Sequence, residues 1–411
     1  MKIAVIGFGS RGSLYTRLYA DLGVTEIAAV CDIRRERLDV AKQRYGLSDD
    51  RLFLSDAEFF AKGKLADLYI VATPDACHKA HALAALKLGA DLQLEKPIAR
   101  SPGDCNQIYR AAKKLGRKIF VCHVLRYAPF FSQIKRELNG GRYGRVSTVD
   151  MTENVAYWHQ AHSYVRGNWR DTDKSSPMIV AKCCHDLDIL AWLINERCKA
   201  VSSMGSLDYF KAENAPEGSA QRCLECTVKD CPYNAERYYI GECVDKNYFD
   251  WPVDVLAVNP TRESVYEALK TGPYGRCVFK CDNNAVDHQV ADMLFESGAT
   301  AHLTMTAFSK DCYRKIHVHC QKGEIYGDMR DNKLVCNIFG GESKIIDTAK
   351  SGGDGGFGHG GGDYLLVKDI AGLYAGQEAT ALTDIENSMQ SHIIGFAAEK
   401  SRLNGGKLIK I

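Results

Sequence analysis

Three glycines near the start of the chain have the spacing of a phosphate-binding turn. Gly7, Gly9 and Gly12 form G-x-G-x-x-G between an apolar run and a helical segment. Glycine lets the chain turn tightly and approach a pyrophosphate closely, and the amides that begin the helix favour negative charge. Asp32 ends the next apolar run, where a carboxylate can bind ribose hydroxyls. The residues of this motif expected to bind a dinucleotide are Gly7, Phe8, Gly9, Ser10, Arg11, Gly12, Asp32 and Ile33.

The same motif bears on which dinucleotide binds. Asp32 favours NAD, because a carboxylate binds the free ribose hydroxyls. Arg34 and Arg35 follow directly and could instead hold the 2′-phosphate of NADP, which is the less favoured alternative. A second alternative is a glycine turn in an α/β domain that binds no nucleotide.

A lysine at the end of a later predicted strand is a candidate for catalysis. Residues 91–97 are expected to form a strand that leads into Lys96 and Pro97. Ligands of open α/β sheets bind at the carboxyl ends of strands, so an ammonium there can hydrogen-bond a substrate hydroxyl or an emerging carbonyl. The alternative is an exposed surface lysine.

The segments around this lysine resemble the family of glucose-fructose oxidoreductase, inositol dehydrogenase and MocA (Gfo/Idh/MocA), and the resemblance spans essentially the whole chain. ATPDACH at 72–78 is similar to the family's Thr-Pro-Asn-x-x-His segment, with Asp75 in place of asparagine, and LEKPIA at 94–99 contains its Glu-Lys-Pro motif. The resemblance implies an NAD-dependent oxidoreductase. It places these further residues at the cofactor: Thr73, Pro74, His78, Glu95, Lys96 and Arg126.

A predicted helix in the second half is similar to the one that carries the family's Asp-x-Gly-x-His-x-x-Asp pattern. In PMIVAKCCHDLDILAWLI at 177–194, His185 falls on the catalytic histidine and Asp188 on the acidic residue after it. Imidazole suits a proton acceptor, because its ordinary pKa lies near 6.5. Ala181, with Lys182 beside it, stands where the family has aspartate. The Lys-Asp-His trio is therefore incomplete, which puts the simple dehydrogenase mechanism in doubt.

One segment between the predicted domains concentrates aromatic, histidine and arginine side chains, in ENVAYWHQAHSYVRGNWR at 153–170. Aromatic faces bind sugar C–H groups and Arg and His donate to hydroxyls, although a buried aromatic hinge is an equal alternative. In the glycine-rich stretch 351–363, His359 and Asp363 could lie over the same pocket. The expected substrate-binding residues are Lys96, Trp158, His162, Arg166, Trp169, Arg170, His185, Asp188 and His359.

Six of the sixteen cysteines are clustered in one loop-rich region. Thiolates at C-x-x-C spacing can chelate one ion, which would stabilise a segment that lacks its own core. Structural zinc is the favoured occupant, a four-cysteine iron–sulfur cluster is possible, and reduced thiols packed in a small insertion are an equal alternative. The expected ligands are Cys223, Cys226, Cys231 and Cys281, with Cys243 or Cys277 as substitutes for one of them.

The elements that must position these residues divide into two predicted domains. Over residues 1–122, short β-branched runs alternate with helical segments, which predicts a doubly wound parallel sheet, the Rossmann arrangement. Residues 123–411 contain long alternating segments typical of an α+β domain with a large, predominantly antiparallel sheet, interrupted by a Cys-rich insertion at about 211–284. Thr383 and Glu386 fit a capping box that begins the last helix.

Composition narrows the classes of partner. The 411 residues carry a net charge of +2 without any long run of like charges, which argues against nucleic acid and membrane surfaces as partners. No apolar run approaches the length of a membrane span, and the first residues do not form a secretory segment, so a cytoplasmic protein with reduced thiols is expected. The family resemblance further implies a homo-oligomer, a dimer or a tetramer.

Together these features predict hydride transfer from a secondary hydroxyl of a sugar, polyol or glycoside to NAD, with Lys96 and His185 as catalytic residues. One rival is a redox-assisted glycosidase or lyase, which would use NAD transiently: oxidation, elimination and re-reduction would cleave a glycosidic bond without net NADH. A second rival is a nucleotide-binding sensor, but a sensor needs neither Lys96 nor His185.

Overall fold

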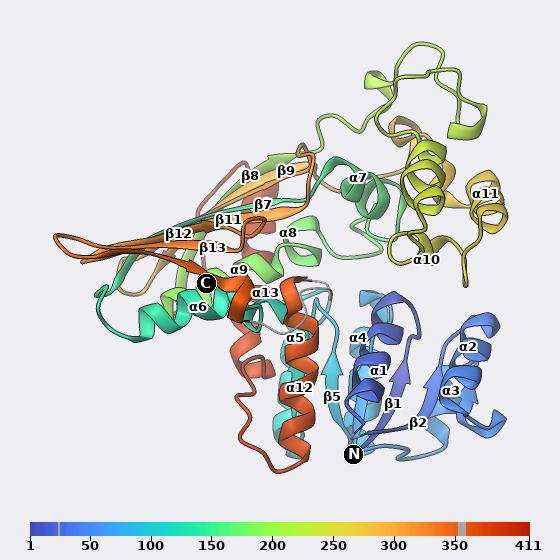
Figure 1. Cartoon of the computed structure of the whole chain (residues 1–411), viewed down its shortest axis with the longest axis horizontal. Coiled ribbons are helices and arrows are strands. Elements are labelled where there is room, and N and C mark those ends of the chain that lie inside the picture. Colours follow the sequence, from blue (N-terminus) through green and yellow to red (C-terminus); the bar gives the residue numbers. More distant parts are fainter. Residues whose placement is uncertain (24, 352–358) are drawn as a thin grey trace.

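The computed structural model describes residues 1–23, 25–351 and 359–411, and its first sheet is parallel (Figure 1). The strands of this sheet are β1 (Lys2–Ile6), β2 (Glu26–Cys31), β3 (Leu52–Phe53), β4 (Leu68–Val71), β5 (Asp91–Leu94) and β6 (Ile119–Val121). They lie in the order β3-β2-β1-β4-β5-β6. The strand order reverses between β1 and β4, which opens a crevice at the carboxyl ends of the strands, where ligands bind.

Helices cover both faces of this sheet, so its apolar strands are almost fully buried. The helices are α1 (Ser10–Asp21), α2 (Arg35–Tyr45), α3 (Asp56–Ala61), α4 (Asp75–Lys87) and α5 (Pro102–Leu115). α2 and α5 each end at a glycine in the left-handed region, Gly46 and Gly116. The predicted Rossmann arrangement is confirmed.

The second sheet has nine strands and is antiparallel except where β7 and β10 pair. The strands are β7 (Val146–Asn154), β8 (Cys198–Ser206), β9 (His288–Phe295), β10 (Thr300–Thr306), β11 (Tyr313–Cys320), β12 (Gly323–Asp328), β13 (Lys333–Ile338), β14 (Ser343–Asp347) and β15 (Ile409–Lys410). Their order is β14-β13-β12-β11-β7-β10-β9-β8-β15. Buried and more exposed residues alternate along β9 and β10, because one face packs on helices and the other does not. The predicted α+β fold class is confirmed.

The helices that cover this sheet lie on one face of it (Figure 1). They are α6 (Pro129–Asn139), α8 (Met178–Ala181), α9 (Cys184–Ile194) and α13 (Ile385–Leu403). The predicted capping box of α13 is wrong: Asp384, not Thr383, is the N-cap and accepts a hydrogen bond from the backbone N–H of Asn387. No helix in the described part of the chain is both long and apolar enough to cross a membrane.

The C-terminal region also completes the first domain. α12 (Gly362–Tyr374) packs beside α1, and its apolar residues, Leu366, Val367 and Ile370, belong to the same core cluster as Tyr15 of α1. The start of α12 therefore lies close to the glycine turn, although more than 300 residues separate them in the sequence.

The Cys-rich insertion has little regular structure, one small core of its own and a second that it shares with Ala161, Val165 and Ala307. Its longest helices are α11 (Arg262–Thr271) and the π-helical η6 (Glu236–Cys243), with α10 (Val253–Leu256) and several 3₁₀ turns between and around them. Figure 1 shows it beyond the end of the second sheet, beside α7 (Tyr157–Gln160) and over the first domain. The π-helical η3 (Ala161–Arg166) continues α7 and packs against it.

Candidate active site

The glycine turn leaves room for close approach of a ligand. Gly7 has a φ of +87°, and a Cβ on Gly12 would lie 1.9 Å from the Gly7 carbonyl oxygen, so a side chain there would push α1 away from β1. Asp32 accepts hydrogen bonds from the backbone N–H groups of Phe8 (2.7 Å) and Arg34 (2.9 Å). These bonds fix its carboxylate beside the turn, at the carboxyl end of β2.

The basic residues after Asp32 are turned toward acidic neighbours. Arg34 lies 3.8 Å from Glu36, and Arg35 lies 3.0 Å from Asp39 in the same helix. Both arginines pair with acidic residues of α2, and Arg34 also lines the cleft between α2 and residues 256–259. The preference for NAD over NADP stays a prediction. Ile33 is 87% exposed at the same edge and offers an apolar surface to a ligand.

Arg11 crosses from the glycine turn to two carboxylates. Its guanidinium donates to Glu95 (2.7 Å) and to Asp363 (2.5 Å), and Asp363 lies 2.9 Å from Nδ1 of His359. Burial raises the pKa of Asp363, but the charges of Arg11 and His359 outweigh burial and hold that pKa well below its usual range. Arg11 and Glu95, both predicted at the cofactor, thus join the turn to β5 and to the start of α12.

The two loops that carry the family-like motifs are joined by one histidine. The ring nitrogens of His78 lie 2.8 Å from the carbonyl oxygen of Thr73 and 2.7 Å from that of Pro97. The Lys96–Pro97 peptide bond is cis. His78 therefore positions the loops around Lys96, and its ring is buried behind them.

Lys96 extends from the end of β5 toward the second domain. Its Nζ donates a 2.7 Å hydrogen bond to the backbone carbonyl of Ala181, and the ring of Trp169 lies 5.9 Å from the ammonium. A backbone carbonyl thus occupies the place where the resemblance implies a carboxylate. The ammonium keeps further N–H groups to offer to a substrate oxygen.

His185 lies at the beginning of α9, near Lys96 and His359. Its ring centroid is 5.5 Å from that of His359, and its Nδ1 is buried without a hydrogen-bond partner among the residues that the structure describes. Burial, then the charge of Lys96, lowers the pKa of His185 well below its ordinary value. The ring is therefore neutral and able to accept a proton. The structure brings together four of the predicted substrate-binding residues: Lys96, Trp169, His185 and His359.

A second buried group of charges beside this site was not predicted from the sequence. Lys182 lies 3.2 Å from Glu153, and Arg314 lies 2.8 Å from Glu153 and 2.6 Å from Asp186. Burial raises the pKa of Glu153, but Arg314 and Lys182 outweigh burial and lower it; His359 contributes in the same direction. The one sequence signal for this charged group was that Lys182 follows Ala181, the position where the family has aspartate.

Asp188 and Arg126, which were predicted to bind substrate and cofactor, pair with each other in this structure. Arg126 donates to both carboxylate oxygens of Asp188 at 2.7 Å, and also to the carbonyls of Leu382 and Asn387. His123 Nδ1 lies 2.9 Å from the same carboxylate. All of these groups are buried, so neither charged side chain is free to face a ligand.

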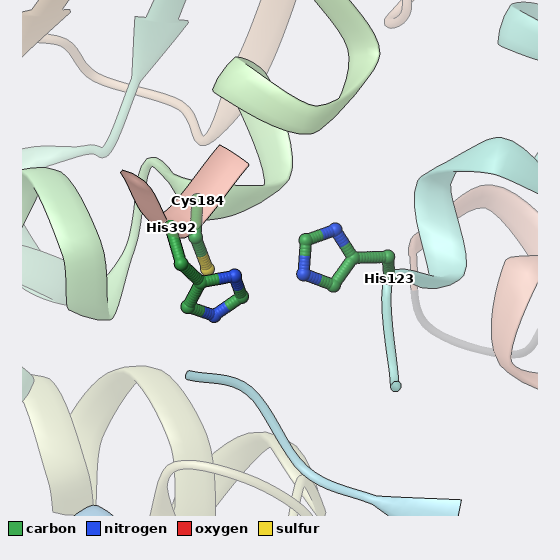
Figure 2. Close-up of side chains that lie close together, drawn as sticks. All are labelled: His123, Cys184 and His392. Atoms are coloured by element: carbon green, nitrogen blue, oxygen red, sulfur yellow. The ribbon is translucent and has the colours of Figure 1, made fainter. Parts of the chain in front are cut away.

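His123, Cys184 and His392 form a buried trio beside these residues. The three residue types are common metal ligands, but the ring nitrogens of His392 are already hydrogen-bonded. Figure 2 shows His123, Cys184 and His392 converging from separate segments. Nε2 of His392 accepts a hydrogen bond from the backbone N–H of Ile98 (2.9 Å), while its Nδ1 lies 3.1 Å from the carbonyl of Ser388. Since both ring nitrogens are engaged by the backbone, the trio joins the domains and is not a metal centre.

The aromatic segment forms a wall that continues into the insertion. His159 packs edge-on against Trp251 at 4.8 Å between ring centroids, and Trp158 stacks on Tyr238 at 5.6 Å. Burial, then the charge of Lys182, lowers the pKa of His159, and Lys96 and His359 act on it too, so this histidine adjoins the reacting groups. Trp251 was not predicted as a site residue, because it is a single tryptophan in a loop and no motif surrounds it in the sequence.

Three predicted substrate-binding residues contact the insertion in this structure. His162 lies 2.8 Å from the hydroxyl of Tyr239, and burial lowers its pKa to about 3. Arg166 donates to backbone carbonyls of the insertion, and Arg170 pairs with Asp282 at 3.0 Å. The same residue types that bind sugars also bind loop carbonyls, so the sequence could not separate the two roles.

The insertion reaches the cofactor-binding edge of the first domain. Asp254 of α10 interacts with Ser10 of the glycine turn and, through its charge, with Arg37 of α2. The guanidinium of Arg37 lies against Gly9, and its Nε is buried without a partner among the described residues. A cleft of about 480 Å³ separates α2 from residues 256–259. Arg37 and Asp254 are candidate cofactor residues that the motif did not reveal.

Four cysteines line one small enclosed cavity in the insertion: Cys223, Cys226, Cys231 and Cys277. Cys281, a predicted ligand, lies outside this cavity, and its thiol donates to the carbonyl of Cys277. Cys277, one of the two predicted substitutes, lines the cavity. Cys243 packs in the neighbouring apolar core and does not line the cavity either.

Comparison with protein families gives two matches that together cover most of the chain. Residues 1–123 match the model described as "Oxidoreductase family, NAD-binding Rossmann fold" (GFO_IDH_MocA). Residues 135–401 match the model described as "Oxidoreductase family, C-terminal alpha/beta domain" of the same family. The second match alone covers more than half of the chain.

Similar curated proteins are also oxidoreductases by name. YteT of Bacillus subtilis (strain 168), which is named an oxidoreductase, is 25% identical over 377 residues, which are 88% of this chain and 84% of YteT. Inositol 2-dehydrogenase of Salmonella typhimurium is 26% identical over 203 residues, 49% of this chain and 56% of that enzyme. The chain thus spans only about half the length of the inositol dehydrogenases that it matches.

Solved structures share the fold over the whole chain. Levoglucosan dehydrogenase in complex with NADH and levoglucosan has a TM-score of 0.72 and 16% identity, with 100% of this chain and 99% of that chain covered. Aldose-aldose oxidoreductase from Caulobacter crescentus, complexed with glycerol, has a TM-score of 0.67 and 16% identity, with 100% and 99% covered. At such identity the likeness is one of fold.

Proposed function

The chain belongs to the Gfo/Idh/MocA oxidoreductase family, and from this premise we propose that it oxidises a secondary hydroxyl of a sugar, polyol or glycoside with NAD⁺. The observation that carries the proposal is the convergence of Lys96 and a neutral His185 at the carboxyl end of β5. This is the end of the sheet toward which the glycine turn also faces.

The residues present fit a dinucleotide. Gly12 allows α1 to begin directly against the carbonyl of Gly7, where any Cβ would clash, and Asp32 is held beside this turn for ribose hydroxyls. The unpartnered Nε of Arg37, near Gly9, is a donor suited to a phosphate oxygen. When bound, NAD⁺ supplies the acceptor for the hydride that leaves the alcohol carbon.

The chain's own residues divide the remaining work. His185 accepts the hydroxyl proton as the C–H bond breaks and the C=O bond forms, and its lowered pKa keeps the ring unprotonated for this role. Lys96 donates a hydrogen bond to the same oxygen and orients it, while its bond to Ala181 fixes the direction of the ammonium. The wall of Trp158, His159 and Trp251 offers apolar faces to a sugar ring.

A second candidate function is redox-assisted cleavage of a glycoside. Lys182 and Glu153 form a second buried pair of an acid and a base near His159 and His359. A simple dehydrogenation needs only one proton acceptor and does not require this second pair. Such a pair could remove a proton next to a transient ketone and protonate the leaving oxygen. Ala181, which stands where the family has an aspartate, also supports this second candidate function.

One incubation separates the candidates. Purified protein with NAD⁺ and a panel of sugars, polyols and aryl glycosides is followed by NADH absorbance and product masses together. NADH accumulation with a product two hydrogens lighter supports the dehydrogenase, whereas glycoside cleavage without lasting NADH supports the second candidate. Both candidates would be rejected if the protein bound no NAD⁺ and turned over none of the compounds.

Other features of the proposal rest on the sequence. A carbohydrate as the small-molecule partner agrees with the relatives named above. Homo-oligomerisation and a cytoplasmic location remain predictions.

A further inference from the structure

The four cysteines of the insertion come from its two ends. Cys223, Cys226 and Cys231 belong to one loop, and Cys277 lies about fifty residues later. The two segments are held side by side by a hydrogen bond from the backbone N–H of Cys277 to the carbonyl of Gln221. The cavity between the four side chains has a volume of about 10 Å³. Such a space accepts one water-sized sphere.

A buried cation beside these thiols lacks a counter-ion. Arg166 is 2% exposed, and its guanidinium donates to the carbonyls of Arg276 and Tyr233, both at 2.7 Å, and to Sγ of Cys223 at 3.5 Å. No carboxylate in the described part of the chain forms an ion pair with it. A buried guanidinium is costly unless negative charge lies next to it. The nearest source of such charge is the thiol cluster.

We propose that Cys223, Cys226, Cys231 and Cys277 bind one structural Zn²⁺ and that Arg166 is the cation that balances part of the negative charge of the resulting site. Four thiolates and Zn²⁺ carry a net charge of −2, which gives the buried guanidinium the partner that it lacks. The loop-rich insertion, whose own core in the described part of the chain is small, is closed by this link between its ends.

Zinc is favoured over an iron–sulfur cluster by size. A zinc ion holds its sulfurs at about 2.3 Å, hence about 3.8 Å from one another, and needs no space beyond the centre of the four thiols. A [4Fe–4S] cube places eight atoms between the same side chains and therefore needs a much larger space than a single ion does. In the described structure no three of these sulfurs lie mutually within 4.8 Å, so zinc draws the thiols inward by side-chain rotation.

The site acts on the substrate pocket through Arg166. This arginine ends η3, which continues the helix that carries Trp158 and His159. Fixing its guanidinium between Cys223 and the insertion carbonyls therefore fixes the aromatic wall. The inference concerns this link and does not depend on which substrate is oxidised.

The first test is elemental analysis of the wild-type protein, purified without chelator. One zinc per chain that survives dialysis against EDTA, and that a mercurial reagent releases from the native protein as it titrates the thiols, supports the site. Iron with acid-labile sulfide, zinc that dialyses away without loss of thermal stability, or no metal would each overturn it. This measurement needs no variant, so misfolding cannot obscure it.

Matched variants then assign the ligands. Cys277→Ser is expected to lose at least nine-tenths of the zinc, whereas Cys281→Ser, four residues away and outside the cavity, is expected to keep it. Arg166→Met should weaken zinc binding about 10- to 100-fold in competition with a chromophoric chelator, while Arg170→Met should not. Equal zinc in both cysteine variants would overturn the ligand assignment.

Discussion

Lys96 Nζ donates a 2.7 Å hydrogen bond to the backbone carbonyl of Ala181, across the junction of the two domains. A carbonyl orients the ammonium as a carboxylate would but adds no negative charge. Lys96 is therefore fixed in direction and still strongly electropositive, which suits a group that holds a substrate oxygen. His185, at the beginning of α9, provides the neutral base.

Replacing this lysine should remove turnover without unfolding the protein. In Lys96→Met, kcat with the best substrate of the panel is expected to fall about 100- to 10,000-fold, because the donor to the reacting oxygen is lost. NAD⁺ affinity, measured by calorimetry, should change little. Lys79→Met is the control, since Lys79 of α4 pairs with Asp104 of α5 and has no contact with Lys96 in the described structure. Equal activity in both variants would show that Lys96 is not catalytic.

The pH dependence of the reaction should report the environment of His185. Its pKa is lowered by burial and by Lys96, so the neutral, proton-accepting form persists below the ordinary imidazole value. The acidic limb of kcat/KM is therefore expected well below pH 6.5, and His185→Asn should reduce kcat about 100-fold or more at every pH. An acidic limb at or above pH 6.5 in the wild type would contradict the assignment.

Asp188 should matter for stability more than for binding. Burial raises its pKa, but Arg126 and His123 outweigh burial and lower it to about 2. Because the folded pKa is below the unfolded value of 3.8, the stabilisation is present above about pH 4 and is lost as pH falls toward 2. Asp188→Asn leaves Arg126 buried without its partner and should lower the free energy of unfolding by about 3–5 kcal/mol.

Urea denaturation at pH 7 and at pH 3 measures this effect. Asp150→Asn, on the exposed face of β7, is the control and should change stability by less than about 0.5 kcal/mol. If Asp188→Asn were as stable as wild type at pH 7, the junction would not depend on this ion pair.

The sequence identified those parts of the site that depend on local geometry. Gly7, Gly12 and Asp32 must stand where they do for a turn between a strand and a helix, and Lys96 follows from its place at the end of β5. Such signals are contained within one unit of strand, turn and helix. The two sheets could be predicted for the same reason, from alternation and helical periodicity.

Residues whose role depends on a distant partner could not be assigned in this way. Arg166 looks like a hydroxyl-binding arginine until its acceptors, which lie 67 and 110 residues away, are known. Cys277 and Cys281 have equivalent sequence surroundings, and only the fold decides which of them faces the other thiols. Trp251 carries no local signal, because its contact with His159 arises when the insertion folds back on α7.

This contact leads to a prediction about substrate binding. Trp251 presents its ring to His159 and also lies 5.7 Å from Trp158, so it forms part of the wall proposed to bind a sugar ring. Trp251→Ala removes that apolar face but leaves Lys96 and His185 in place. KM should rise about tenfold while kcat stays within about threefold, because the lost contact is made with bound substrate and transition state alike.

Steady-state kinetics with saturating NAD⁺ tests the prediction, and Tyr248→Ala is the matched control. Tyr248 is an aromatic residue of the same insertion, but it is 48% exposed and has no ring contact with the wall. It should leave both KM and kcat near the wild-type values. A fall in kcat with unchanged KM in Trp251→Ala would place Trp251 among the groups that orient the reacting centre, and an effect shared by both variants would point to general loosening of the insertion.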